Sequence, residues 1–133
     1  MHSTFSDGTY TPEELIRAGA EAGLYAMALT DHDNTAGLER FLAAAGEAGI
    51  RALPGVEVSA EHAPGGMDIL GYGIDCGHAL LNEKLQWILE GRNERNEEIL
   101  KRLNDLGCLL TMEDVASQAG ADVVGRPHSA RAG

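Results

Sequence analysis

Short apolar runs and helically spaced apolar residues alternate along the first half of the chain. In the first helical pattern, residues 15–22, apolar side chains recur at three- and four-residue intervals. Thr11, Pro12 and Glu14 form a start signal, with Thr11 as the N-cap, Pro12 in the first turn and Glu14 closing a capping box. Gly23 supplies the stop. The sequence therefore predicts a helix between Thr11 and Gly23.

Strand patterns and a second helical pattern follow. Residues 25–30 form an apolar run suited to a buried strand, and residues 36–48 form a helical pattern. A strand then covers residues 50–58, with an interruption at residues 54–55, and another covers residues 67–74 after a loop rich in glycine, proline and histidine. This alternation predicts βαβ units and a parallel sheet in an α/β fold.

The second half of the chain has a different pattern. Residues 80–106 form a long, charged helical segment that ends at Gly107, and Thr111 opens another short helix as its N-cap. We therefore expect residues 1–79 to form the first part of a (β/α) barrel and residues 80–133 to form a helical insertion, before the remaining barrel strands. A closed barrel typically needs about 250 residues. The 133 residues predict an open partial sheet or one piece of a longer protein. Because such a barrel does not close, we expect one sheet edge and some apolar helix faces to be uncovered, which favours aggregation of the isolated chain.

Composition is that of an ordinary soluble domain, with 44% hydrophobic residues. No apolar run approaches the roughly 20 residues that cross a membrane, and the polar start shows no secretory signal. Cys76 and Cys108 lie far apart without a CxxC partner, which favours reduced thiols over a disulfide or zinc ligands. We therefore expect a cytoplasmic protein without a membrane partner.

The formal net charge of −11 bears on the class of partner. Binding to nucleic-acid phosphates needs clusters of lysine and arginine, so this charge argues against a protein that coats duplex DNA or RNA. Acidic residues that hold cations reverse the local field in one cleft. The charge therefore does not exclude a metal enzyme that acts on a small phosphorylated molecule.

Histidines and carboxylates cluster where the predicted strands end or begin. They lie in residues 2–7 before the first helix, in residues 31–33 after the first strand, at Glu57 and at Asp68. The carboxyl ends of parallel strands collect catalytic residues. Imidazole and carboxylate together suit divalent Mn, Fe or Zn, and two or three such ions generate hydroxide from water and neutralise phosphoryl charge.

Each of these signals also has a purely structural interpretation. Asp7 with the following glycine is a turn signal, and residues 31–34 suit a turn with a helix cap. A histidine such as His32 on its own is more often not a ligand. Glu57 lies between two valines, and a carboxylate in an apolar strand needs a partner. The joint occurrence favours a metal site more than any single residue does.

Six segments in this order resemble the PHP-domain (polymerase and histidinol phosphatase) family. The segments are His2-Ser3-Thr4-Phe5-Ser6-Asp7-Gly8, Thr11-Pro12-Glu13-Glu14-Leu15-Ile16, Ala28-Leu29-Thr30-Asp31-His32-Asp33, Pro54-Gly55-Val56-Glu57-Val58-Ser59, Leu70-Gly71-Tyr72 and Gly125-Arg126-Pro127-His128. The chain is similar to the small stand-alone phosphoesterases more than to the polymerase-attached domains. Some of those relatives dephosphorylate nucleoside 3′,5′-bisphosphates or trim RNA from its 5′ end.

The resemblance implies a fold, a metal site and a reaction. The intact family has a distorted seven-stranded barrel, of which this chain matches the N-terminal half. His2, Asp7 and His32 would be metal ligands, and Glu57 would bridge two metals. The same resemblance gives Glu57, His32 and Asp7 as catalytic residues around two or three ions of Mn, Fe or Zn, where a metal-bridged hydroxide attacks phosphorus.

The chain departs from the family pattern at two positions. The first histidine of the family's His-x-His pair would precede Met1, which suggests an internal start codon or a truncated gene. Asp68 stands where the family usually has histidine, and it is either a changed ligand or a surface carboxylate. The family's later ligands, a histidine and an Asp-x-His segment, would follow Gly133.

Four further residues are candidates for substrate binding. Arg92 and Arg95 match arginines common in the subgroup and could hold a phosphate with the forked guanidinium geometry, or could pair with neighbouring glutamates on a solvated helix. Arg126 and His128 belong to a recognisable motif whose role is less fixed. Trp87 is expected to pack the insertion rather than to stack on a base.

The leading hypothesis is a metal-dependent phosphoesterase, a hydrolase that acts on a small nucleotide or an RNA 5′ end. The alternatives are the PHP domain of a DNA polymerase and a non-catalytic truncated fragment. The isolated chain is expected to have negligible activity, because ligands at both ends would be missing.

Overall fold

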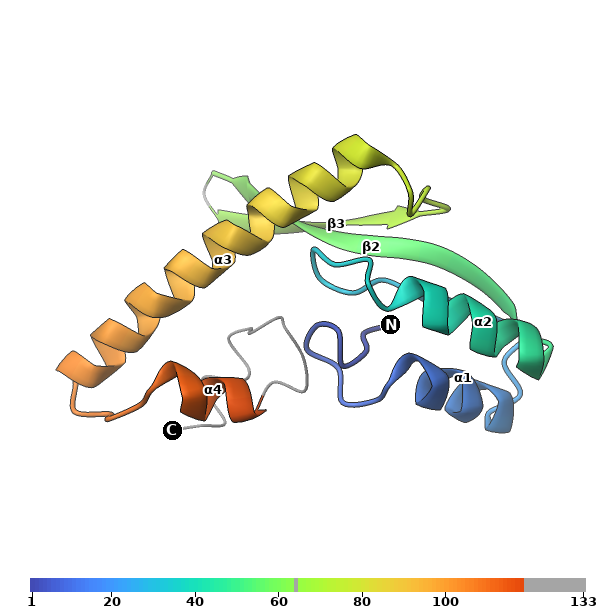
Figure 1. Ribbon diagram of the computed structural model, residues 1–133, viewed down its shortest axis with the longest axis horizontal. Helices are drawn as coiled ribbons and strands as arrows, with labels where there is room; N and C mark the ends of the chain where they lie inside the picture. Colours follow the sequence, from blue (N-terminus) through green and yellow to red (C-terminus); the bar gives the residue numbers. More distant parts are fainter. Residues whose placement is uncertain (64, 119–133) are drawn as a thin grey trace.

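The computed structural model describes residues 1–63 and 65–118 as a mixed α/β structure with one three-stranded sheet (Figure 1). Its elements in chain order are α1 (Pro12–Glu21), β1 (Ala26–Leu29), α2 (Leu38–Ala48), β2 (Arg51–His62), β3 (Gly65–Tyr72), α3 (Ala79–Asp105) and α4 (Met112–Gln118). The predicted α/β class and the predicted order of elements are confirmed.

The sheet has the order β1-β2-β3, and its two pairings differ in direction. β1 and β2 are parallel, with Ala26 opposite Arg51, which confirms that these two predicted strands are neighbours. β3 is antiparallel to β2, so the prediction of a wholly parallel sheet is wrong at this strand. Only residues 63 and 64 lie between β2 and β3. A parallel return needs a crossover of a dozen or more residues, whereas an antiparallel return needs only a short turn.

The predicted interruption of β2 at residues 54–55 is also wrong. β2 continues through this point because the sheet changes partner there: Pro54 is the last residue opposite β1, and Gly55 is the first opposite β3. A β-carbon on Gly55 would lie 2.8 Å from the Gly71 carbonyl oxygen. Glycine therefore lets the two strands approach, and Glu57 follows two residues later on the same unbroken strand.

The helix ends use the local chemistry that the sequence predicted. The Glu14 amide donates to Thr11 Oγ1 at 3.3 Å, and the Thr11 amide donates to Glu14 Oε2 at 2.9 Å, so the capping box of α1 is confirmed. Gly23 and Gly49, with φ of +72° and +69°, follow the ends of α1 and α2 in the left-handed conformation that glycine adopts without strain.

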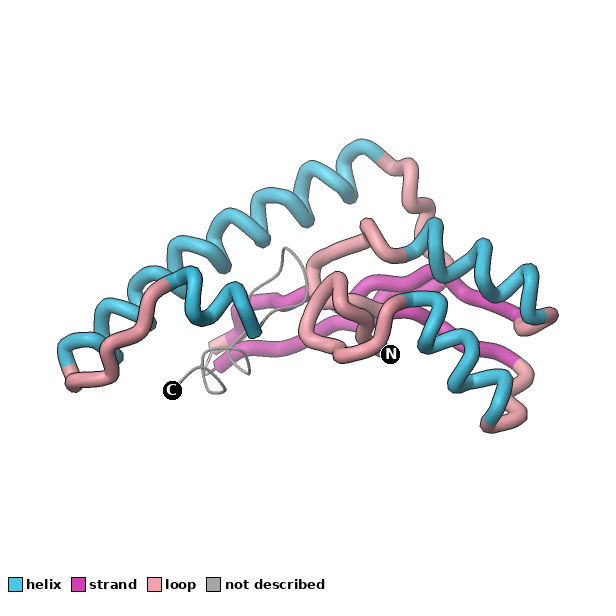
Figure 2. The backbone as a smooth tube through the Cα atoms, turned by 60° about the horizontal axis from the view of Figure 1, so that its bottom comes forward, coloured by secondary structure: helices cyan, strands magenta, loops and turns pink. Residues whose placement is uncertain are grey.

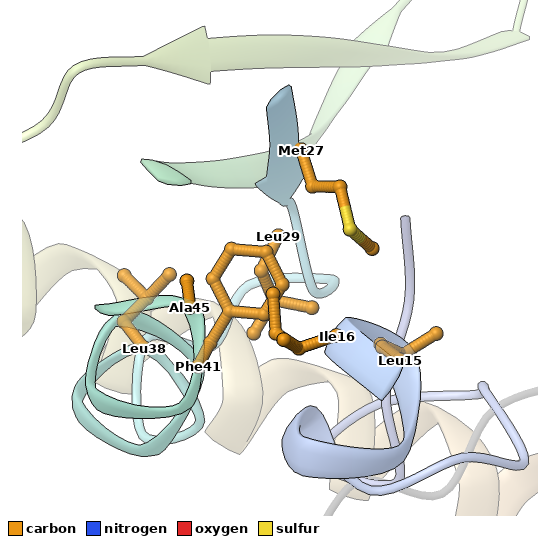
Figure 3. Close-up of a cluster of buried hydrophobic side chains, with 7 residues drawn as sticks. All are labelled: Leu15, Ile16, Met27, Leu29, Leu38, Phe41 and Ala45. Carbon is orange, nitrogen blue, oxygen red and sulfur yellow. The ribbon is translucent and has the colours of Figure 1, made fainter. Parts of the chain in front are cut away.

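The main core lies between the two helices and β1 (Figure 3). It is made of buried apolar side chains from α1, β1 and α2, namely Leu15, Ile16, Met27, Leu29, Leu38, Phe41 and Ala45. A β-carbon on Gly19 would lie 2.1 Å from Met27 Sδ, so the glycine allows α1 to lie directly against β1. This packing fixes the position of the carboxyl end of β1, where the polar residues 30–33 follow.

Figures 1 and 2 show α3 running well beyond the sheet, with α4 lying beside its C-terminal half. Leu100 of α3 and Val115 of α4 form a second, smaller buried cluster. The expectation that Trp87 packs the insertion is wrong, because its side chain is 70% exposed. Leu85, two residues earlier, is buried, and residues two apart on a helix do not share a face.

Apolar side chains remain uncovered on β3, in agreement with the expectation of exposed apolar surface. Met67, Ile69, Leu70 and Tyr72 are each exposed, although they belong to a strand that pairs with β2. Within the described ranges, no helix combines the length and the apolar character that a membrane span requires.

Candidate metal centre

Pairing of the backbone brings the segment after β1 alongside β2. The Glu57 amide donates to the Asp31 carbonyl at 3.1 Å, and the Asp33 amide donates to the Glu57 carbonyl at 2.9 Å. These two hydrogen bonds make His32 and Glu57 an isolated parallel bridge beyond the end of β1. His32 and Glu57, two of the predicted ligands, are therefore neighbours, because the parallel pairing of β1 with β2 continues beyond the end of β1.

The first residues of the chain lie on the other side of β1. The Thr30 amide donates to the Met1 carbonyl at 2.9 Å, which places His2 beside the segment that carries His32. The rings of His2 and His32 have centroids 4.6 Å apart. Three chain segments thus meet at the carboxyl end of β1.

The side chains of His2, Asp7, His32 and Glu57 come together at this point. His2 Nε2 lies 3.0 Å from Glu57 Oε2, and His2 Nδ1 lies 3.5 Å from Asp7 Oδ1. Asp7 Oδ2 lies 3.8 Å from His32 Nε2. One potential ligand atom from each of His2, His32 and Glu57 lies within 4.8 Å of the other two. The four side chains keep 17–30% of their surface exposed, so small molecules can reach them.

The donor set suits a divalent ion. Two imidazoles and a carboxylate are the ligand types that Mn, Fe and Zn accept. His32 Nδ1 is buried without a hydrogen-bond partner among the described residues, and a buried polar atom of this kind needs a partner. The residues present therefore fit the group that the sequence predicted.

Asp68 does not join this group of three. Ser59 Oγ donates to Asp68 Oδ1 at 2.9 Å, across the β2–β3 pairing in which these two residues are opposite each other. Ser59 Oγ also accepts a hydrogen bond from Arg92 Nη2. Asp68 therefore lies at the edge of the site, in a polar cluster with Ser59 and Arg92.

Asp33 ties α3 to the site. Its side chain is fully buried, and its Oδ1 accepts a hydrogen bond from the Ser59 amide at 2.8 Å. Arg92 Nε lies 2.6 Å from Asp33 Oδ2, so the guanidinium and the carboxylate form an ion pair. Only 13% of the Arg92 side chain is exposed. Of the four predicted substrate-binding residues, Arg92 thus contacts Asp33 and Ser59, which are one and two positions along the chain from His32 and Glu57.

The other three predicted substrate-binding residues are Arg95, Arg126 and His128. Arg95 lies half-buried one turn further along α3. Arg126 and His128 lie outside the described residues, so their roles stay predictions. His78 is exposed and caps α3, as its Nδ1 accepts from the Leu81 amide.

Sequence reasoning treated Asp31 and Asp33 only as part of a motif. Both are buried and make contacts with residues more than 20 positions away. Asp33 has φ +50°, a conformation that aspartate tolerates better than most residue types. The signal for them was the pair of carboxylates next to a candidate ligand, because groups around a metal site commonly orient its ligands.

A model of the PHP domain matches residues 1–121, which is most of the chain. The chain belongs to the PHP-domain family. It is 37% identical to the 3′,5′-nucleoside bisphosphate phosphatase of Chromobacterium violaceum over 132 residues, which are 98% of this chain and 46% of that protein. It is 35% identical to the 5′-3′ exoribonuclease of Haemophilus influenzae over 130 residues, which are 98% of this chain and 47% of that protein.

A solved structure shows the same fold. A protein from Bifidobacterium adolescentis, assigned as a metal-dependent phosphoesterase, superposes with a TM-score of 0.91 at 31% sequence identity. The match covers 98% of this chain and 46% of that protein. This PHP-family chain therefore spans about half the length of the relatives that it matches.

Proposed function

We propose that this chain carries the N-terminal part of the catalytic centre of a divalent-metal-dependent phosphoesterase. The observation that supports it best is the convergence of His2, His32 and Glu57, with ligand atoms within 4.8 Å of one another, in a PHP-family fold. The finer fold assignment, a partial (β/α) barrel of the PHP type with α3 and α4 as an insertion, belongs to the same proposal.

His2, His32 and Glu57 would hold the ion, with Asp7 within reach of both rings. A divalent ion of Mn, Fe or Zn supplies Lewis acidity toward a phosphate ester and makes water a better nucleophile near neutral pH. The contribution of the protein is to fix the donors: Glu57 is held by two backbone hydrogen bonds to residues 31 and 33. We keep Asp68 as a candidate residue at the edge of the site, outside the group of three ligands.

Arg92 is the best-supported contact for a substrate phosphate. Asp33 and Ser59 hold its guanidinium from two sides, which orients the group without closing its whole surface. An oriented guanidinium binds a phosphate in a fixed direction and loses little freedom in doing so. Arg95, Arg126 and His128 stay as further candidates for the same role.

The substrate that we propose is a small nucleotide or the 5′ end of an RNA. The support is the activity that the names of two relatives give, a nucleoside bisphosphate phosphatase and a 5′-3′ exoribonuclease, each about one third identical over nearly the whole of this chain. Since this chain matches less than half of each, the activity of the whole protein is part of the proposal.

The test is turnover of a nucleoside 3′,5′-bisphosphate and of a 5′-phosphorylated oligoribonucleotide with Mn²⁺. The 133-residue chain is assayed side by side with a fusion that extends it at both ends, before Met1 and after Gly133, with the corresponding parts of the C. violaceum phosphatase. We expect phosphate release from the fusion, negligible release from the chain alone, and loss of release from the fusion with Glu57→Gln. Glu47→Gln, an exposed glutamate on α2, is the matched control.

Two results would contradict the proposal. Full turnover by the fusion carrying Glu57→Gln would remove Glu57 from the reaction. Turnover of neither substrate by a folded fusion that binds Mn²⁺ would leave a metal-binding domain without this activity, as in the alternatives of a polymerase-attached or non-catalytic domain.

A further inference from the structure

Asp31 is a buried carboxylate to which the proposed function gives no role. Only 1% of its surface is exposed. Its Oδ1 accepts hydrogen bonds from the Ser3 amide at 2.6 Å and from Ser6 Oγ at 2.7 Å, and its Oδ2 accepts from Ser3 Oγ at 2.7 Å. A carboxylate buried this deeply is costly unless such donors surround it.

The donors to Asp31 belong to the loop that carries two predicted ligands. Ser3 follows His2 and Ser6 precedes Asp7, so the carboxylate holds the loop between the two ligands. The same Ser6 hydroxyl lies 3.4 Å from His2 Nδ1. Asp31 therefore reaches the His2 ring through a single intervening hydroxyl.

The loop itself is closed tightly around Ser3. The Ser3 carbonyl accepts from the amides of Ser6 and Gly8, both at 3.0 Å. A β-carbon on Gly8 would lie 2.1 Å from the His2 carbonyl oxygen, so the turn needs a glycine there. These contacts make the loop compact, and its hydrogen bonds to Asp31 at Ser3 and Ser6 lie next to His2 and Asp7.

Asp31 also contacts the other two parts of the site. It precedes His32 in the chain, and its carbonyl accepts the Glu57 amide at 3.1 Å. One residue is thus joined to the His2 loop through its carboxylate, to β2 through its backbone and to His32 through a peptide bond.

We propose that Asp31 is a positioning residue of the metal centre, which sets His2 and Asp7 against His32 and Glu57 through Ser3 and Ser6. This inference rests on the proposed metal centre and names a residue outside its ligand set. Residues that orient metal ligands typically change metal affinity by about 10- to 100-fold when they are replaced.

The experiment compares Co²⁺ binding by the 133-residue chain and its Asp31→Asn variant, followed by visible absorption. The amide keeps the size of the carboxylate but replaces one acceptor oxygen with a donor that faces the serine hydroxyl. We expect an affinity about 10- to 100-fold lower and an altered Co²⁺ spectrum, with the far-UV circular dichroism unchanged. Asp75→Asn is the matched control, because Asp75 is exposed and its carboxylate accepts a hydrogen bond from the Gly77 amide in its own turn.

An unchanged Co²⁺ affinity and spectrum in folded Asp31→Asn would overturn the inference. A merely structural role would lower the melting temperature and leave the spectrum of the bound ion as it is. If Asp31→Asn does not fold, the double variant Ser3→Ala with Ser6→Ala removes the hydroxyl donors and keeps the carboxylate. It should show the same loss, and wild-type affinity in it would equally overturn the inference.

Failure of the proposed metal centre would give a different result from failure of the inference about Asp31. Absence of Co²⁺ binding by the wild-type chain would contradict the metal centre itself. Amide hydrogen exchange in the metal-free chain would then test whether Asp31 holds the loop of residues 2–8 in place. The inference requires faster exchange at Ser3, Ser6 and Gly8 in Asp31→Asn with unchanged exchange at Met27 in β1, and equal exchange in the loop would overturn it.

Discussion

Aspartates on both sides of His32 show how single residues build this site. Asp31 holds the loop of residues 2–8, and Asp33 holds Arg92 and the Ser59 amide. The sequence predicted that His2, Asp7, His32 and Glu57 would lie together, and the structure brings them together. It did not predict the roles of the two aspartates, because their partners are remote in sequence and only the fold selects them.

The Asp33 carboxylate is fully buried and forms an ion pair with the Arg92 guanidinium. Asp33→Asn keeps the size, the tolerance of positive φ and the bond from the Ser59 amide, but leaves the Arg92 guanidinium without its counter-charge. We expect a loss of about 3–5 kcal/mol in the free energy of unfolding, the range found when one partner of a buried ion pair is removed. Urea denaturation measures it.

Asp105→Asn, at the exposed end of α3, is the control for this substitution and should change the free energy by no more than about 0.5 kcal/mol. If Asp33→Asn were as stable as this control, the contact of α3 with the site would not depend on the ion pair.

At the scale of elements, the caps and glycine stops of the helices could be predicted from the sequence, but the direction of β3 could not. Caps and glycine stops lie within a few residues of the helices that they end, so the sequence pattern contains them. Only two residues separate β2 from β3, where the sequence pattern placed a longer loop, and this short spacing requires the antiparallel direction. The exposure of Trp87 likewise depends on which face of α3 meets the rest of the molecule.

The capping box of α1 gives a prediction about a single element. Thr11→Ala removes the Oγ1 that accepts the Glu14 amide, and we expect a loss of about 0.5–2 kcal/mol in the free energy of unfolding. Thermal denaturation measures it, with Thr9→Ala, an exposed residue before the helix, as the control. Equal melting of the two variants would show that the box does not stabilise the helix.

The other half of the box predicts a pH dependence. A hydrogen bond from the Thr11 amide holds the pKa of Glu14 below its ordinary value of 4.5. Because the folded-state pKa is the lower one, this stabilisation is complete above pH 4.5 and is lost as the pH falls through the folded-state value. The stability difference between wild type and Glu14→Gln should therefore shrink on acidification, and a difference that is constant from pH 7 to pH 3 would contradict this.

At the scale of the whole molecule, apolar surface on β3 is open. Met67, Ile69, Leu70 and Tyr72 are exposed on a strand that pairs with β2 along one side. Exposed apolar strands promote association between chains. The sequence predicted such a surface from the small number of strands.

We predict that Met67→Lys lowers the self-association of the chain, because a charge on an exposed strand opposes edge-to-edge pairing. Light scattering over a range of concentrations should show a smaller average mass than for wild type. Ala43→Lys, at an exposed position of α2, is the control with the same added charge. The same concentration dependence in both variants would locate the association elsewhere.

Mn²⁺ binding by the 133-residue chain, compared with its Glu57→Gln variant, tests the central claim most directly. Glu57→Gln keeps the shape and removes the charge between His2 and His32, and Glu47→Gln is the control. The free Mn²⁺ signal in electron paramagnetic resonance gives the bound fraction. The account predicts binding by wild type and by the control, and an affinity at least about tenfold lower with Glu57→Gln. Equal Mn²⁺ affinity in all three proteins would contradict a metal centre built on Glu57.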